Sequence, residues 1–305
     1  MWGYTKYNHP AFLLGQKDWD EELLNLIPVV SEAKSDEVND ILHEWFVGLG
    51  EIDYGTSRPG SKPIESEAVV QADTNWILDE AYLGEALSAD MQKMGPVPKI
   101  DRSKAPVKFS TGQGVPNFKM ENTDAGCSYQ TEEERLLGLF RVWNAIEYYF
   151  PYLDIMDESW YDLLNEFIPK ILEASDVQSF ELTICEMTAH LHDVHVRFIN
   201  SQPLKAVVGE YLAPVNMLRT EEGQWVVSDL CGDCPLQAGD VILKLDGTDI
   251  KEIEENRKKY VSVPNDEKLN NPLGVYLLRS KDEEMEITVL RDGKEETYSV
   301  KGTTE

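Results

Sequence analysis

The character of the sequence changes at His190-Leu191-His192-Asp193-Val194-His195-Val196-Arg197-Phe198, a stretch that holds three of the chain's five histidines. Upstream of it, apolar residues recur at helical spacing, as in the stripe formed by Phe180, Ile184, Met187 and Leu191. Downstream, short alternating runs are separated by glycine turns, and residues 196–199 alternate as a strand does. The stretch therefore marks a helix-to-strand junction at a domain boundary, where His195 is a candidate cleft residue.

The composition bounds the class of protein. The chain has 305 residues, enough for two domains, and its hydrophobic content of 42% is that of a folded globular protein. The net charge of −28 disfavours binding to nucleic acid or to anionic membrane surfaces. No apolar run is long enough to cross a bilayer, so we expect no membrane insertion.

The ends of the chain and its cysteines add two expectations. No signal peptide precedes the aromatic-rich opening, which indicates a fragment of a longer protein. The pair Cys231 and Cys234 is a lone CxxC without a second pair that could complete a zinc site. We interpret it as a coincidence or a small loop disulfide, and we expect neither a metal nor a cofactor.

The first two thirds of the chain contain an internal repeat at a constant offset of 141 residues. Tryptophan and proline are scarce, so their recurrence in register is hard to obtain by chance. The matched residues are Trp2, Tyr7, Pro10, Trp19, Leu23, Ile27, Pro28, Glu32 and Ala33 with Trp143, Tyr148, Pro151, Trp160, Leu164, Ile168, Pro169, Glu173 and Ala174. We expect residues 1–127 to hold a degenerate first copy and an irregular connection, and residues 128–200 to hold the second copy.

The second copy predicts three helices. Thr131 with Glu134 indicates the start of the first helix, and Ser159 can cap the second. Pro169 falls inside the second helical pattern, so we expect a kink or a break there. The third helix leads to the histidines. We interpret the aromatic cluster of the second copy as core because of its helical spacing; it comprises Trp143, Tyr148, Tyr149, Phe150 and Trp160.

Residues 201–303 have a β pattern typical of one small module. Residues 211–218 and 224–230 flank a hairpin turn, and residues 283–290 and 295–300 flank a second turn with Asp292-Gly293 at its centre. Helical stretches are expected near residues 251–260 and 266–278. The predicted fold class is therefore α+β, with an all-α N-terminal region followed by a β-rich domain.

Two parts of the sequence resemble known families. The run from Ala238 to Gly247, Ala-Gly-Asp-Val-Ile-Leu-Lys-Leu-Asp-Gly, resembles the core of bacterial PDZ domains. The helical part, with its Trp-x-x-x-x-Tyr-x-x-Pro pattern and the Asp-Val-His ending at His195, is similar to the N-terminal region of tail-specific (C-terminal-processing) serine peptidases of the tricorn-like Bacteroidetes type. The two resemblances together cover nearly the whole chain.

The resemblance implies a non-catalytic portion of a peptidase that cleaves proteins or peptides. The PDZ groove would take an extended segment or C-terminus of substrate as an added strand beside Gly209, Tyr211, Leu212 and Ala213. By the resemblance, residues 209–214 stand at the carboxylate-binding loop. They depart from the family's glycine-rich form, and Pro214 has no N–H to donate to a carboxylate. The resemblance also implies a periplasmic, cell-envelope or secreted location.

The resemblance gives His195 the role of general base toward a serine in a following catalytic domain, because a serine hydroxyl needs an adjacent base. That domain is missing from residues 1–305, so we expect this chain to be inactive alone. Some members of the family use a Ser-Lys pair, in which case the histidine is structural.

Two other interpretations stay open. The chain can be a peptide-binding scaffold without enzymatic activity. It can also be a metallohydrolase that uses His190, His192 and His195, although the aspartate of the H-x-H-x-D-H pattern is one place too early and later histidine ligands are absent from the sequence.

Overall fold

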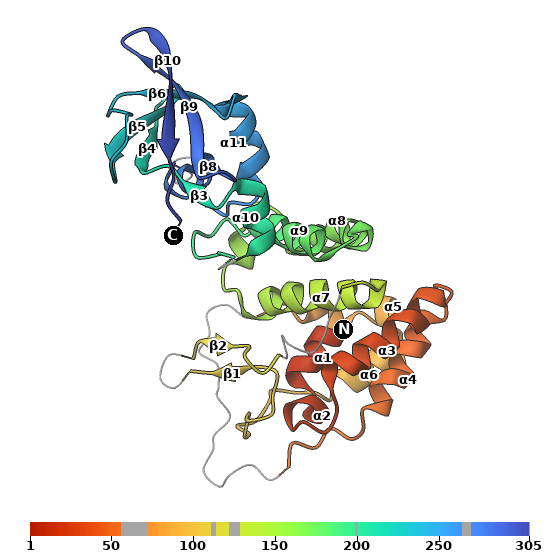
Figure 1. Ribbon diagram of the computed structural model, residues 1–305. Helices are drawn as coiled ribbons and strands as arrows, with labels where there is room; N and C mark the ends of the chain where they lie inside the picture. Colours follow the sequence, from red (N-terminus) through yellow and green to blue (C-terminus); the bar gives the residue numbers. More distant parts are fainter. Residues whose placement is uncertain (56–71, 111–113, 122–128, 199–200, 264–269, 305) are drawn as a thin grey trace. The chain divides into compact units, whose positions relative to one another are not determined.

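The structure is a computed structural model that describes all residues except 56–71, 111–113, 122–128, 199–200, 264–269 and 305. The chain divides into two compact units (Figure 1). The first comprises Met1–Ile155 with Ser159–Leu164, and the second comprises Met156–Glu158 with Asn165–Glu305. Of the helices in the described part, none has both the length and the apolarity needed to cross a membrane.

The first unit is mainly helical. Its elements are α1 (Trp2–Asn8), α2 (Pro10–Leu13), α3 (Trp19–Glu32), α4 (Val38–Gly48), η1 (Asn75–Leu78), α5 (Glu80–Leu83), α6 (Glu85–Met91), β1 (Lys108–Phe109), β2 (Pro116–Asn117), α7 (Glu132–Tyr149) and η2 (Leu153–Ile155). One apolar cluster joins α2, α4 and α6 through residues such as Phe12, Phe46 and Met91. A second joins α1, α3 and α7 through Trp2, Ile27 and Leu137.

The three predicted helices after residue 130 are present as α7, α8 (Trp160–Glu173) and α9 (Val177–Ala189). Thr131 caps α7 by accepting the N–H of Glu134, and Ser159 accepts the N–H of Asp162 at the start of α8. Of the kink or break expected at Pro169, the break does not occur, since α8 continues to Glu173. Its buried apolar residues hold the helix together across the one hydrogen bond that proline removes.

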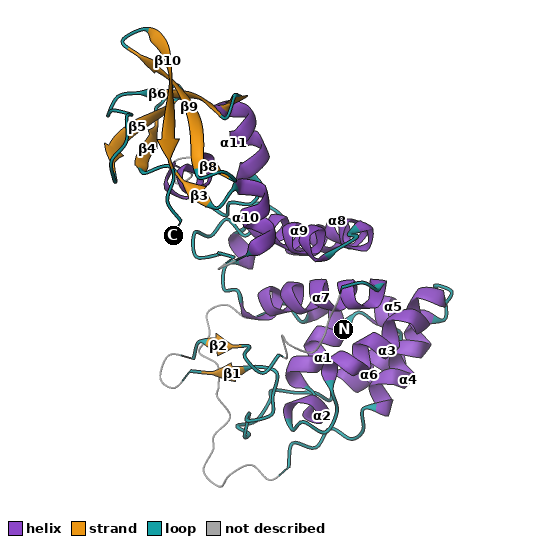
Figure 2. Cartoon of the chain, viewed as in Figure 1, coloured by secondary structure: helices purple, strands orange, loops and turns teal. Residues whose placement is uncertain are grey.

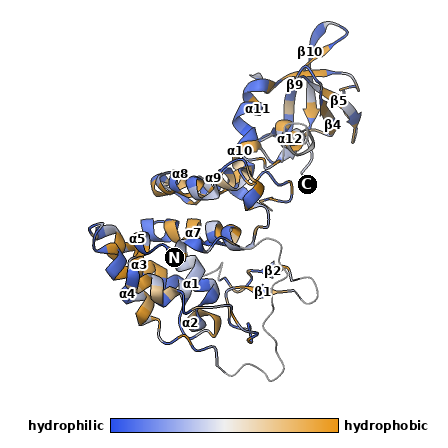
Figure 3. Cartoon of the chain, turned by 180° about the vertical axis from the view of Figure 1, so that it is seen from behind, coloured by the Kyte–Doolittle hydropathy of each residue, from blue (hydrophilic) through white to orange (hydrophobic). Residues whose placement is uncertain are grey.

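The apolar stripe that opened the sequence pattern is buried as predicted. Phe180, Ile184, Met187 and Leu191 are all less than a tenth exposed. Figure 3 shows hydrophobic and hydrophilic residues interleaved along α8 and α9, as amphipathic helices require.

The repeat predicts equivalent sites for its paired tryptophans, and their contacts match only in part. The indole Nε1 of Trp2 donates to the carbonyl oxygen of Trp19 at 2.8 Å, and that of Trp143 donates to the carbonyl oxygen of Trp160 at 2.9 Å. Nε1 of Trp160 donates to the carbonyl oxygen of Trp143 at 3.1 Å, whereas the buried Nε1 of Trp19 has no hydrogen-bond partner among the described residues. Helices α3 and α8 are each 14 residues long, with Pro28 in one and Pro169 in the other. Superposition of residues 2–50 on 143–191 stays a prediction.

The second unit contains the main sheet (Figure 2). After α10 (Gln202–Val208), its elements are β3 (Tyr211–Leu212), β4 (Val215–Arg219), β5 (Trp225–Leu230), β6 (Val241–Leu245), β7 (Thr248–Asp249), α11 (Ile250–Lys258), α12 (Asn270–Leu277), β8 (Arg279–Ser280), β9 (Glu284–Arg291) and β10 (Lys294–Lys301). The main sheet is antiparallel with the order β10-β9-β6-β5-β4, and β7 pairs with β6. The architecture is therefore a mixed α+β fold.

Both predicted hairpins are present. Strands β9 and β10 pair through a turn in which Asp292 and Gly293 have φ of 49° and 77°, the left-handed values that an Asp-Gly hairpin turn requires. Strands β4 and β5 form the other hairpin. The apolar side chains between sheet and helices form one core that includes Trp225, Leu277 and Ile287.

Two strand predictions are wrong. The strand expected over residues 211–218 is divided at Pro214, because proline has no N–H for a strand ladder, and the two parts β3 and β4 belong to different sheets. The segment 196–198 is not a strand either: the N–H of Val196 closes a turn onto the carbonyl of Asp193. The last residue of that predicted strand, at position 199, lies outside the described residues.

Candidate functional site

His195 lies in the segment that follows α9 and is oriented by its neighbour Asp193. The carboxylate oxygen Oδ1 of Asp193 lies 2.7 Å from Nδ1 of His195 and also accepts the backbone N–H of His195 at 2.8 Å. A carboxylate only accepts, so Nδ1 carries the proton and Nε2 of the neutral imidazole is left as an acceptor. This is the orientation that a general base needs.

The surroundings of His195 are open, since its side chain is 88% exposed. Asp193 is held in turn by Ser262, whose hydroxyl oxygen accepts the Asp193 N–H at 2.8 Å. Serines upstream of His195 belong to helix starts: the Ser159 hydroxyl caps α8, the Ser179 N–H donates to the Asp176 cap of α9, and the backbone N–H of Ser175 donates to the Ser179 hydroxyl. Ser128 lies outside the described residues.

The three histidines do not converge on one point. Nδ1 of His190 lies 2.6 Å from Glu158, and Nδ1 of His192 lies 3.1 Å from the carbonyl oxygen of Val263. Within the described residues, no three histidine, cysteine or carboxylate side chains gather as metal ligands would. The described residues therefore give no support to the metallohydrolase interpretation. In the same part of the chain, Cys231 and Cys234 are free thiols.

The residues predicted to bind peptide are already paired within the domain. Strand β3 pairs with β8, and the N–H and C=O of Leu212 both bond to Thr303 at 2.9 Å. The N–H of Ala213 bonds to Leu278. A peptide cannot join beside Tyr211 and Leu212 without displacing one of these partners, which corrects the expected position of the added strand.

Gly209 has a packing role at the same place. Its φ is +101°, and a methyl group on it would lie 2.5 Å from backbone atoms of Ser280. Only glycine permits both the left-handed conformation and this close approach. Gly209 thus lets the end of α10 pass against β8.

Strand β4 is one of the two edge strands of the main sheet, and β10 is the other. Helix α12 packs beside this strand. Both elements carry exposed apolar side chains, Leu218 on β4 and Val275 on α12. An edge strand with a neighbouring helix is the arrangement into which an extended peptide can be added.

The Gly239-Asp240 turn of the PDZ-like motif is built around a buried carboxylate. Asp240 is 2% exposed and receives two hydrogen bonds from Arg291, at 2.7 and 2.6 Å, and one from the N–H of Gln237 at 2.7 Å. Burial alone would raise the pKa of Asp240, but these hydrogen bonds outweigh it and hold the pKa below its usual value. The motif aspartate therefore fixes the start of β6.

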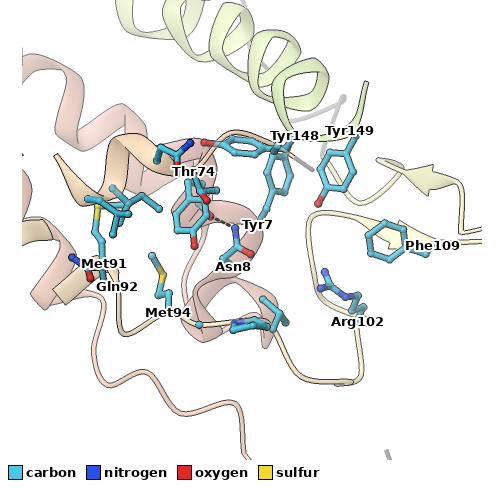
Figure 4. Close-up of a pocket in the computed structure, with 18 residues that line it drawn as sticks. Tyr7, Asn8, Thr74, Met91, Gln92, Met94, Arg102, Phe109, Tyr148 and Tyr149 are labelled. Atoms are coloured by element: carbon cyan, nitrogen blue, oxygen red, sulfur yellow. Dashed lines mark hydrogen bonds between the residues drawn. The ribbon is translucent and has the colours of Figure 1, made fainter. Parts of the chain in front are cut away.

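Sequence reasoning missed a cavity in the first unit, with a volume of about 580 Å³ (Figure 4). Its walls include Tyr4, Tyr148, Tyr149, Phe109, Met94 and Arg102. The interpretation of the aromatic cluster as core holds for Trp143 and Trp160, which are buried, whereas the two tyrosines face the cavity. The lining comes from segments far apart in sequence, so no local pattern signals it.

Comparisons with known proteins are sparse. No family model matches the chain, and no curated protein sequence matches it. Three solved structures of the chlamydial serine protease CPAF are similar: a mutant (12% identity, TM-score 0.42), the mature protein with lactacystin (10%, 0.39) and the mature protein alone (11%, 0.39). Each match covers 56% of this chain and 34 or 35% of the other, so the chain spans about a third of these structures. At these TM-scores the likenesses do not assign the chain to a family.

Proposed function

We propose that residues 201–303 form a PDZ-like domain that binds an extended or C-terminal peptide segment, as part of a tail-specific serine peptidase of the tricorn-like Bacteroidetes type. The observation that carries the proposal is the edge strand β4 beside α12. The unpaired backbone groups of such an edge bind a peptide as an additional strand, and the helix forms the other wall of the groove. Ala213 and Pro214 lead directly into β4 and so lie where one end of the peptide arrives.

The helix wall of the proposed groove has an apolar side chain available for a peptide. Val275 of α12 is 42% exposed, and an apolar side chain at such a position selects peptide residues by burial. Leu218 follows the buried Met217 on β4 and therefore lies on the opposite face of the sheet. The alternative position for the peptide, beside β3, is already occupied by β8 and Thr303.

The test uses the chain of residues 1–305 and a displayed library of random peptides with free C-termini. An enriched peptide is synthesised with a fluorophore, and its affinity is measured by fluorescence anisotropy for the wild-type protein and for Val275→Asp. We expect a loss of roughly tenfold or more, since a desolvated carboxylate would face the bound peptide. Val177→Asp is the matched control, because Val177 is also exposed but lies at the start of α9. A peptide that binds Val275→Asp as tightly as wild type refutes the groove.

We further propose that His195 is the general base of the complete peptidase, acting on a serine outside residues 1–305. The Asp193 contact supports this role, because it fixes the tautomer in which Nε2 can accept a proton. In the complete gene product, His195→Ala should lower peptidase activity by several orders of magnitude, whereas His192→Ala should leave it unchanged. An active His195→Ala enzyme favours the Ser-Lys arrangement. A gene product without any peptidase activity favours the scaffold alternative.

A further inference from the structure

We propose that the cavity of the first unit is a binding site for a ligand that carries one anionic group, a carboxylate or a phosphate, next to a planar apolar group. Arg102 would hold the anion, and the rings of Tyr148, Tyr149 and Phe109 would hold the planar group. A volume of about 580 Å³ is that of a small-molecule pocket.

Arg102 is a cation without an acidic partner in the described part of the chain. Its guanidinium lies over the ring of Phe109, 5.2 Å from the ring centre, and its Nη1 is excluded from solvent without a hydrogen-bond partner among the described residues. The sequence contains 56 acidic residues for 28 lysines and arginines, so carboxylates are abundant. A guanidinium whose Nη1 is buried without an acidic partner among the described residues is costly for folding alone, and a guanidinium binds carboxylate or phosphate with two hydrogen bonds.

The titratable groups that act electrostatically on Arg102 do not compete with an anionic ligand. They are the phenols of Tyr149 and Tyr54. Burial raises the pKa of Tyr54 to about 12 and raises that of Tyr149 further, so both stay neutral at physiological pH. Figure 4 shows the Tyr149 hydroxyl directed toward Arg102, which makes it a second donor for the same anion.

Aromatic rings make the wall next to the guanidinium. Tyr149 lies between the rings of Phe109 and Tyr7, with ring centres 6.1 and 5.1 Å away, and Tyr148 packs on Tyr4 at 6.1 Å. These contacts hold the rings in place before a ligand arrives. A planar ring in the ligand can stack on them, whereas a cation would be repelled by Arg102 and a neutral ligand would leave its charge unpaired.

The test measures binding of three small probes to residues 1–305 by isothermal titration calorimetry: phenyl phosphate, 3-phenylpropionate and the neutral benzyl alcohol. We expect saturable binding of at least one anion in the millimolar range or tighter. Arg102→Met should weaken it roughly tenfold or more, because a charge-assisted hydrogen bond is lost while the volume is kept. Arg197→Met is the matched control, since Arg197 is exposed in the second unit.

A measurement on the wild-type protein makes the result independent of variant folding. Phenylglyoxal modifies accessible guanidinium groups, and peptide mass spectrometry reports the rate at each arginine. The bound anion should protect Arg102 and leave Arg197 unchanged. Selective binding of the phosphate or of the carboxylate identifies the source of the anionic group, and either supports the site. Absence of saturable binding, equal binding of benzyl alcohol, or unaltered modification of Arg102 overturns it.

Discussion

His9 predicts a pH dependence of folding that can be isolated by one substitution. Its ring is fully buried, and its Nδ1 accepts the N–H of Ala11 at 3.1 Å, which caps α2. The neutral ring then carries its proton on Nε2, which has no hydrogen-bond partner among the described residues. Burial, with a smaller contribution from Lys17, lowers the pKa of His9 from 6.5 to about 4.

The sign follows from the order of the two pKa values. The folded pKa lies below the unfolded value of 6.5, so the unfolded chain takes up the proton first as the pH falls. The stability associated with neutral His9 is therefore fully present above pH 6.5 and is lost as the pH falls toward 4. One pKa unit corresponds to about 1.4 kcal/mol, so the loss between pH values of about 7.5 and about 5.5 is about 1.3 kcal/mol. The full loss at lower pH is about 3 kcal/mol.

The assay is urea unfolding at those two pH values for wild type and His9→Asn. Asparagine accepts hydrogen bonds at a helix N-cap and does not titrate, so it keeps the cap and removes the proton. Carboxylates and the other histidines titrate in both proteins, and their contribution cancels in the difference of differences. We expect the variant to lose about 1.3 kcal/mol less than wild type over this interval. Equal pH dependence in the two proteins would refute the assignment of a neutral, buried His9.

Three further substitutions test contacts within the individual units. Trp143→Phe should destabilise the first unit by about 2 kcal/mol in urea unfolding, because the indole donor to the Trp160 carbonyl is lost with part of the buried ring; an unchanged midpoint contradicts this. Gly209→Ala should cost about 2–3 kcal/mol, since its methyl group would meet the backbone of β8 at a positive φ; a neutral outcome in the same assay means that β8 moves freely. Asp240→Asn should cost about 3 kcal/mol by leaving the Arg291 guanidinium without its carboxylate, and calorimetry showing an unaltered melting temperature would exclude a structural role for the pair.

The parts of the fold that sequence predicts are those fixed by local pattern. Phe180, Ile184 and Met187 share one helical face, and burial of that face requires no knowledge of the partner surface. Asp292 and Gly293 encode their own turn, since few other residue pairs accept its backbone angles. Pro214 is a local signal that disfavours one continuous strand over residues 211–218, because it lacks an N–H for the strand ladder. The division into β3 and β4 follows from it.

The candidate sites also differ in whether local sequence or tertiary structure determines them. The contact between Asp193 and His195 is local, because the two residues are only two positions apart. The position of the bound peptide is not local: it was expected beside β3, and the sequence does not reveal that β8 and Thr303 already pair with that strand. The cavity is further from local pattern, because Arg102 approaches Tyr149 only through tertiary structure. Aromatic residues that share one face of a helix can contact either the side chains of a core or a bound ligand. A guanidinium left without an acid among the described residues is the feature that favours a ligand, and no local sequence pattern encodes it because its surroundings are set by the tertiary structure.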